Sequence, residues 1–259
     1  MSTPELLLLV VAGLAAGSIN GAVGSGSLVT LPVLLALGLQ PASAVTTNTI
    51  AMVLSALGGV LAYRRELRVE LPQLRPLVIV STVGGVVGSI LLLTTPPGAI
   101  KVVVPVLIGI ALLLVLFQPQ VARWVARRPS GSAAAHPYGS AGLRASIVGC
   151  SVYGGYFAAA QGVLLLGVLG AFTGQPMGRI NGVKNLLTLT VNVTAAVMFT
   201  VASFLGKADV VWAATAAVAF GATFGGYAGG RIAKAVPAWV LRTVIVLVAG
   251  TSLVKQFLG

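Results

Sequence analysis

Long apolar runs follow one another along the whole 259-residue chain. A helix needs about 20 apolar residues to cross the hydrocarbon core of a bilayer, and eight runs have that length. They cover residues 5–23, 43–63, 76–95, 99–118, 142–160, 180–204, 209–230 and 238–258. Two shorter apolar runs, 26–38 and 162–173, follow the first and the fifth. The pattern predicts an all-α, polytopic bundle of transmembrane helices with a short or interrupted helix in each half.

An internal repeat relates the two halves. The sequence TVGGVVGS at 82–89 matches TFGGYAGG at 223–230, and Gln40-Pro41 matches Gln175-Pro176 further upstream. Several matches in the same order along the chain indicate a duplication. We therefore expect three parts, which are a first transmembrane repeat over 1–118, a polar linker over 119–141 and a second transmembrane repeat over 142–259.

The distribution of positive charge predicts that the two repeats have opposite orientations. The loop 64–75 holds four arginines, whereas its counterpart near 205–209 holds only Lys207, which Asp209 offsets. Because cytoplasmic loops collect Lys and Arg, equivalent loops with unequal charge should lie on opposite sides. On this scheme 64–75, 119–144 and 231–238 are cytoplasmic, and both termini lie outside. The sequence leaves open whether the chain has eight helices, two of them interrupted, or ten segments.

The composition excludes a water-soluble globule. Charged residues make up 8% of the chain and hydrophobic residues 57%, whereas soluble domains carry about 25% charged residues. The composition predicts a multi-pass protein of the cell inner (plasma) membrane. The net charge of +12 follows mostly from the positive-inside rule, and its remainder is consistent with a pathway for anions. Nucleic-acid binding is not expected, because no groove-reading motif accompanies the basic residues.

Motifs for enzymatic chemistry are missing from the sequence. The chain has one cysteine, Cys150, and one histidine, His136. It has no phosphate-binding loop, metal-ligand cluster or nucleophile elbow. We therefore predict no catalytic residues, no metal, no cofactor and no enzymatic activity. The four acidic residues, Glu5, Glu66, Glu70 and Asp209, are expected at segment ends or in loops. A proton relay through carboxylates inside the membrane is accordingly not predicted.

The first candidate site is a glycine-rich break over residues 17–32, with the sequence GSINGAVGSGSLVTLP. Glycine at this density favours unwinding of a helix. Freed backbone groups are tolerated in a membrane where they line a cavity. The short helix expected from about Gly26 would direct its free N-terminal amides into the break, which is typical of an anion site. Close packing of helices through small residues is the alternative interpretation.

A matching break covers residues 153–167, with the sequence YGGYFAAAQGVLLLG. It keeps glycine at 154, 155 and 162, but Ala158-Ala159-Ala160-Gln161 stands where the first half has more glycine. Paired interrupted segments in inverted halves are the best indication that a sequence offers of a transporter site.

The helix expected from about residue 178 carries a polar stripe. Asn181, Asn185, Thr188 and Asn192 are spaced to share one helix face, with Lys184 at its edge. A lysine inside a membrane helix indicates a functional residue, although snorkelling to the surface is the alternative. In the first half Asn48 shares a face with Ser55 and Gly59, and we expect the two stripes to meet.

Two segments resemble the sulfite exporter TauE/SafE family of membrane permeases. They are NGAVGSGSLVTLPVLLALGLQPASAVTTNTIA, which begins at Asn20, and GQPMGRINGVKNLLTLTVNVTAAVMF, which begins at Gly174. The resemblance runs over essentially the whole chain and implies export of small sulfur-containing anions, sulfite or organosulfonates. The second break departs from the family's glycine-rich form.

Together, the residues and the resemblance predict a transporter that works by alternating access of two inverted repeats. The residues predicted to bind the anion are Asn20, Gly21, Gly24, Ser25, Gly26, Ser27, Asn48, Gly155, Gln161, Gly162, Asn181, Lys184, Asn185, Thr188 and Asn192. The expected partners are a small sulfur-containing anion and the lipid bilayer, and a homodimer is left open. The alternatives are a channel or uniporter for other small organic anions and a non-transporting membrane assembly protein.

Overall fold

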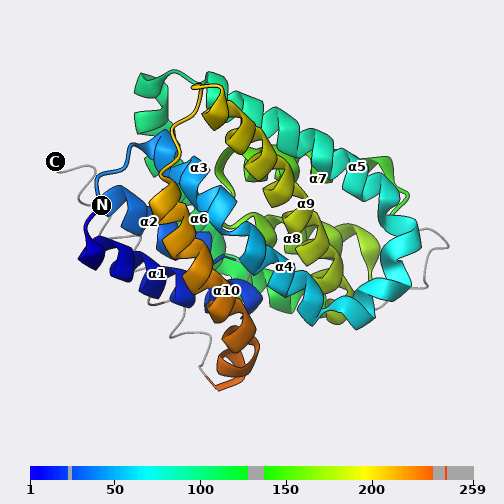
Figure 1. Ribbon diagram of the computed structural model, residues 1–259. Helices are drawn as coiled ribbons and strands as arrows, with labels where there is room; N and C mark the ends of the chain where they lie inside the picture. The colour runs from blue at the N-terminus through cyan, green and yellow to red at the C-terminus, as the bar shows by residue number, and fades with distance from the viewer. Residues whose placement is uncertain (23–24, 128–136, 236–242, 244–259) are drawn as a thin grey trace.

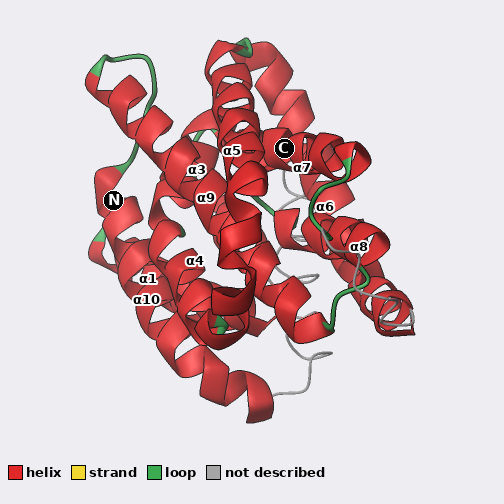
Figure 2. Cartoon of the chain, turned by 90° about the vertical axis from the view of Figure 1, so that its right-hand side faces the viewer, coloured by secondary structure: helices red, strands yellow, loops and turns green. Residues whose placement is uncertain are grey.

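The computed structural model describes residues 1–22, 25–127, 137–235 and 243, which form helices and short loops without any strand (Figures 1 and 2). The helices are α1 (Thr3–Ala22), α2 (Ser27–Ala36), α3 (Pro41–Ala51), α4 (Val53–Ala62), α5 (Arg64–Thr94), α6 (Pro97–Arg127), α7 (Ala141–Phe157), α8 (Gln161–Thr173), α9 (Met177–Phe204) and α10 (Trp212–Ala235). The predicted all-α class is confirmed. The apolar run 238–258 lies outside the described residues.

Five segments of the described chain are long and apolar enough to cross a membrane. They are Thr3–Asn20, Pro41–Ala62, Arg64–Thr94, Pro97–Arg127 and Met177–Phe204. The second combines α3 and α4, which are separated only by Met52. The helices α2 and α8 are the short apolar helices that the sequence predicts after the first and the fifth run. Large apolar side chains on the outside of the bundle, such as Val102, Leu113 and Phe117, suit contact with lipid.

Two segments expected to be polar connections are helical instead. Residues 64–75 form the first turns of α5, and residues 119–127 form the end of α6. Both segments are rich in arginine, leucine, glutamate, alanine or glutamine, which favour helix, and Leu67, Leu74 and Val125 bury their side chains. At 31 residues each, α5 and α6 are about 46 Å long. They therefore exceed the roughly 30 Å hydrocarbon core.

Each half of the sequence packs a helix closely against the other half. The first helix, α1, lies along α10, and α7 lies along α5 (Figure 1). A Cβ atom added at Gly17 or Gly221 would come within 3 Å of the backbone of the facing helix in the α1–α10 pair. The same holds for Gly88 and Gly155 in the α5–α7 pair. These glycines thus let the paired helices approach each other closely.

The directions of the packed helices follow from the same contacts. Positions 13 and 17 of α1 face positions 218 and 222 of α10, so these two helices run parallel. In contrast, Gly59 of α4 faces Asn185 of α9 and the later Tyr63 faces the earlier Gly182, so α4 and α9 run antiparallel. These are the directions that inverted repeats require, and the inversion itself stays a prediction.

The buried apolar side chains form two separate clusters. One contains residues of α1, α2, α3, α6 and α10, together with Leu92 of α5, Phe157 of α7, Val163 of α8 and Ala195 and Phe199 of α9. The other contains residues of α5, α7 and α8 together with Ile180, Val183 and Leu187 of α9. The boundary on α9 therefore falls between Leu187 and Ala195. That interval holds Thr188 and Asn192 of the predicted stripe.

Candidate anion-binding site

The first break is shorter than the sequence suggests. The helix α1 continues through Gly17 and Gly21 to Ala22, and α2 starts at Ser27 after Gly26 as its N-cap. The expected unwinding from residue 17 is wrong, because Gly17 serves close packing against α10 and stays helical. Gly26 is also a packing residue, since a Cβ atom there would lie within 3 Å of the Ala16 carbonyl. Gly24 lies outside the described residues.

Polar side chains around this break connect α1, α2, α3 and α4. Asn20 Nδ2 donates to Ser55 Oγ at 3.1 Å, and Thr30 Oγ1 donates to Asn48 Oδ1. Asn48 is 1% exposed, and its Nδ2 has no partner in the described part of the chain. The same is true of the buried Ser25 Oγ, and Ser27 is buried nearby in the chain. The break thus offers an amide donor and a hydroxyl that no described residue satisfies.

The second break occupies only residues 158–160, between α7 and α8. Ala158 and Ala160 have positive φ angles of 63° and 59°, a conformation that alanine adopts only at a cost. Neither position carries the glycine that would have indicated such a turn in the sequence. Tyr153 Oη donates to the Ala159 carbonyl at 2.8 Å and supports the turn. The turn leaves Gln161 and Gly162 as the first residues of α8.

Gln161 is the most unusual polar side chain of this break. It is 0% exposed, and neither Oε1 nor Nε2 has a hydrogen-bond partner among the described residues. The amide lies against Gly154 of α7, where an added Cβ atom would come within 3 Å of it. In contrast, Gly155 faces the backbone of Gly85 on α5. The structure therefore places Gln161 and Gly162 at the break and Gly155 in a helix contact.

The predicted stripe on α9 lies at the contact with α4. Asn185 Nδ2 donates to the Gly59 carbonyl at 3.2 Å, which is where the stripes of the two halves meet. Asn192 is 5% exposed with Oδ1 unpartnered, and Thr188 Oγ1 is also unpartnered within the described chain. Asn181 is only half-buried near the start of α9. The stripe therefore has a surface end at Asn181 and a buried end from Lys184 to Asn192.

Lys184 is a buried cation without a counterion among the described residues. Its side chain is 5% exposed, seven residues after the first residue of α9, and it makes none of the hydrogen bonds or ion pairs found in the described chain. A charged side chain at the centre of a membrane helix costs about 2.5–3.5 kcal/mol on insertion scales. Snorkelling would leave the ammonium exposed, and the burial of Lys184 argues against it.

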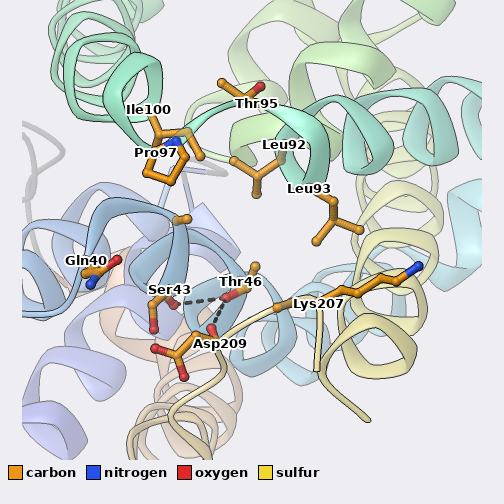
Figure 3. Close-up of a pocket in the computed structure, with 12 residues that line it drawn as sticks. Gln40, Ser43, Thr46, Leu92, Leu93, Thr95, Pro97, Ile100, Lys207 and Asp209 are labelled. Atoms are coloured by element: carbon orange, nitrogen blue, oxygen red, sulfur yellow. Dashed lines mark hydrogen bonds between the residues drawn. The ribbon is translucent and has the colours of Figure 1, made fainter. Parts of the chain in front are cut away.

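A cavity of about 210 Å³ opens at the start of α3 (Figure 3). Three turns that the charge distribution places outside meet there, represented by Gln40, Thr95 and Lys207. Thr46 Oγ1 donates to the Asp209 carbonyl at 2.9 Å and ties α3 to the loop before α10. Asn48 follows Thr46 by two residues along α3. Because residues two apart in a helix point to different faces, Asn48 does not share the face of Thr46 and is not among the residues that line the cavity.

Glu70 is a buried acidic residue whose position differs from the one expected from the sequence. It lies within α5 at 3% exposure and not in a loop. Its Oε1 is 3.3 Å from Nη1 of Arg179 on α9, and Arg179 also donates to Gln175 Oε1 at 3.1 Å. A buried carboxylate persists where a cation compensates it. The signal was present in the four-residue spacing of Glu66 and Glu70, which suits a helix, but the arginines nearby suggested a solvated loop.

An all-helical bundle in which five segments of the described chain are long and apolar enough to cross a membrane is typical of polytopic membrane proteins. A sequence model of the family described as Sulfite exporter TauE/SafE matches residues 9–255. The chain belongs to this family, and it is a multi-pass membrane protein and a membrane transporter.

Several curated relatives carry names of the same kind. The chain is 25% identical to the Probable membrane transporter protein YfcA of Escherichia coli strain K12, over 98% of this chain and 91% of the relative. It is 32% identical to the Probable membrane transporter protein ORF9 of Sinorhizobium sp, over 41% of each chain. A Probable membrane transporter protein of Haemophilus influenzae is 31% identical over 45% of this chain and 46% of the relative. No solved structure matches the chain.

Proposed function

We propose that the protein exports small sulfur-containing anions, sulfite or organosulfonates, across the cell inner membrane. The anion binds between the two breaks and the α9 stripe. Lys184 neutralises its charge, and Ser25, Asn48, Gln161 and Asn192 supply hydrogen bonds. A membrane potential that is negative inside drives an anion outward by about 2.3 kcal/mol per charge per 100 mV. Export in this direction therefore needs no coupled proton.

The observation that carries this proposal is the combination of Lys184 with unsatisfied buried polar groups. Buried polar side chains nearly always have hydrogen-bond partners. In the described residues, however, Ser25, Asn48, Gln161, Thr188 and Asn192 each leave at least one buried atom unpartnered. All five belong to the set predicted from the sequence. A bound oxyanion would accept hydrogen bonds from the donors among them and compensate the charge of Lys184.

The test measures sulfite and organosulfonate flux with purified protein in proteoliposomes. We expect Lys184→Ala to lower the flux at least tenfold and Lys184→Arg to keep a larger part of it, because arginine preserves the charge. Lys101→Ala, which removes an exposed lysine of α6, is the matched control and should leave flux unchanged. Intact flux in Lys184→Ala would refute the site.

Two further measurements separate the alternatives. A channel or uniporter would show flux that does not saturate and no counterflow. A membrane assembly protein would show no thermal shift with sulfite, thiosulfate, sulfonates or carboxylates. We expect saturable flux, counterflow and a shift with sulfite or a sulfonate. A larger thermal shift with a carboxylate would indicate that the substrate is another organic anion.

The helix packing bears on how alternating access operates. The glycine contacts between α1 and α10 and between α5 and α7 bring backbone against backbone, and each pair joins the two sequence halves. Rocking of one half against the other would break both. We infer that the moving units exchange a helix, so that α10 moves with α1 to α4 and α5 moves with α7 to α9. The polar contact of α4 with α9 then lies between the units.

Disulfide cross-links distinguish the two kinds of motion. Built Cβ atoms at Gly85 and Gly182 lie 3.3 Å from Thr194 Cβ and 3.7 Å from Tyr63 Cβ, respectively, close to the usual Cβ separation of a disulfide. In a background in which Cys150 is replaced by Ala, we expect transport to survive oxidation of the Cys pair at 85 and 194, which lies inside one unit. Oxidation of the pair at 63 and 182, which ties the C-cap of α4 to α9, should block transport reversibly. Loss of transport with both pairs would instead support rocking of the sequence halves.

A further inference from the structure

The end of α6 carries an arginine–tryptophan surface that the transport site does not use. It consists of Gln120, Arg123, Trp124 and Arg127, which line a cavity of about 260 Å³. Their spacing of three and four residues places them on one helix face, and all four are exposed. This face belongs to the part of α6 that follows the apolar run 99–118. It therefore lies near the boundary between the hydrocarbon core and the headgroups.

The opposite face of the same helix end is anchored in the protein. Val125 packs against Gly170 of α8, where an added Cβ atom would come within 3 Å of the valine side chain, and Val121 lies 3.5 Å from the corresponding position at Gly167. Because α8 holds this part of α6 by its apolar side, the arginine–tryptophan surface has a fixed orientation away from α8. Such an anchored surface can present its side chains to a ligand without first being ordered.

The two arginines have guanidinium groups available for a ligand. Arg123 Nε donates to the Pro119 carbonyl at 3.4 Å, which leaves its terminal nitrogens, and Arg127 makes no hydrogen bond or ion pair with any described residue. The guanidinium group matches phosphate oxygens in a two-pronged geometry. Tryptophan is enriched at the level of the lipid headgroups. The charge distribution places this end of α6 on the cytoplasmic side, where the leaflet surface is negative.

We propose that the arginine–tryptophan surface binds the phosphate group of an anionic phospholipid of the inner leaflet. Arg123 and Arg127 hold the phosphate oxygens, and Trp124 lies at the level of the glycerol backbone. The two positive charges held at the phosphate provide a preference for anionic over zwitterionic lipid. This site is independent of the anion that the protein transports.

The test compares lipid retention by native mass spectrometry of the full chain, purified from mixed phosphatidylcholine and phosphatidylglycerol nanodiscs. We expect the wild-type protein to retain phosphatidylglycerol at least about tenfold better than the variant with both Arg123→Gln and Arg127→Gln. The variant with Arg64→Gln and Arg65→Gln is the matched control, because it removes two exposed arginines of α5. It should retain the lipid like the wild type.

Two more arms identify the ligand. Replacement of both residues by lysine keeps the charge but loses the two-pronged geometry, and we expect it to bind clearly less lipid than the wild type. Inorganic phosphate at millimolar concentration should not displace the lipid. Equal loss in the Arg64 and Arg65 control would mean that surface charge alone attracts the lipid and would overturn the proposal. Displacement by phosphate, or retention unchanged by the glutamine pair, would overturn it as well.

Discussion

Ala158 and Ala160 turn the chain between α7 and α8 with left-handed backbone conformations. The left-handed conformation costs an L-residue roughly 1–2 kcal/mol, and glycine escapes this cost. We predict that Ala158→Gly raises the stability by about 1 kcal/mol, because Ala158 is only half-buried and loses little packing. The buried Ala159, which lacks a positive φ, serves as the control. Ala159→Gly should lower the stability.

Thermal unfolding in detergent micelles measures both variants. A lower midpoint for Ala158→Gly, equal to that of Ala159→Gly, would contradict the strained turn. The comparison also bears on the site, since the turn positions Gln161. If the strain serves to hold Gln161 unpartnered, Ala158→Gly should also lower sulfite affinity while the protein becomes more stable.

Gly88 of α5 has a different role, which is to let α7 approach. A Cβ atom at this position would come within 3 Å of the Val152 carbonyl, and overpacking of this kind costs about 1–3 kcal/mol. We predict that Gly88→Ala destabilises the protein by that amount. Gly109 of α6 has no neighbour within 4 Å of an added Cβ atom, so Gly109→Ala should be neutral or stabilising, because alanine favours helix. Equal midpoints for the two variants would contradict the close contact of α5 with α7.

The site residues that the sequence could predict are those whose chemistry is unusual for a membrane helix. Lys184, Asn185 and Asn192 stand out by type and spacing, and the structure buries all three and brings Asn185 to Gly59 of α4. The role of Gly155 could not be predicted in the same way, because a glycine that frees a backbone and a glycine that receives a neighbouring helix look alike in a sequence. Only the facing helix, which comes from the other half of the chain, distinguishes the two.

At the scale of elements, hydrophobic patterning predicted the short helices but not the full length of the long ones. Apolar runs report the part of a helix that is in lipid. Apolar runs do not indicate the polar helical turns by which α5 and α6 continue beyond the lipid-facing part. The arginine-rich segment 64–75 therefore appeared to be a loop, although Leu67 and Leu74 are buried and Leu67 contacts Gly182 of α9. The same error concealed the ion pair of Glu70 with Arg179, which joins α5 to α9.

Tyr138, in the segment before α7, adds a titratable group to the contact between α5 and α9. Tyr138 is 3% exposed, and burial, followed by the nearby Glu70 carboxylate, raises the pKa of its hydroxyl above the ordinary value of 10.0. A raised pKa in the folded state means that the folded protein holds the proton more tightly than the unfolded chain does. Its contribution to stability is therefore complete below pH 10 and is lost as the pH rises above that value.

We predict that the wild-type protein loses stability above pH 10 more steeply than Tyr138→Phe. The phenylalanine variant keeps the ring in its buried position and removes the ionisable hydroxyl. Unfolding midpoints measured between pH 8 and pH 11 in detergent test this expectation. Burial and the nearby Glu66 also raise the pKa of Tyr63, which is less buried, so Tyr63→Phe should show the same effect more weakly. Parallel pH curves for the wild type and Tyr138→Phe would contradict the prediction.

For the whole molecule, the contacts between turns agree with the sidedness inferred from charge. The turns at Gln40, Thr95 and Lys207, all poor in positive charge, meet in one cavity. The start of α5 meets the start of α9 through Glu70 and Arg179, near the arginine-rich sequence. Turns assigned to the same side by charge are thus brought together by packing. The α1–α10 and α5–α7 contacts also join helices that come from opposite halves of the sequence.

This sidedness predicts which residues a membrane-impermeant maleimide reaches in intact cells. In a background in which Cys150 is replaced by Ala, Lys207→Cys should be labelled from outside, because Lys207 is exposed at the outer cavity. Arg65→Cys, exposed at the start of α5, should be labelled only after the membrane is permeabilised. Labelling of both sites in denatured protein controls for expression. If Arg65→Cys reacts in intact cells and Lys207→Cys does not, the orientation is reversed and the arginine–tryptophan surface lies in the outer leaflet. If both react from the same side, the three-turn cavity and the start of α5 cannot lie at opposite faces of the membrane, and the inverted arrangement of the repeats fails with them.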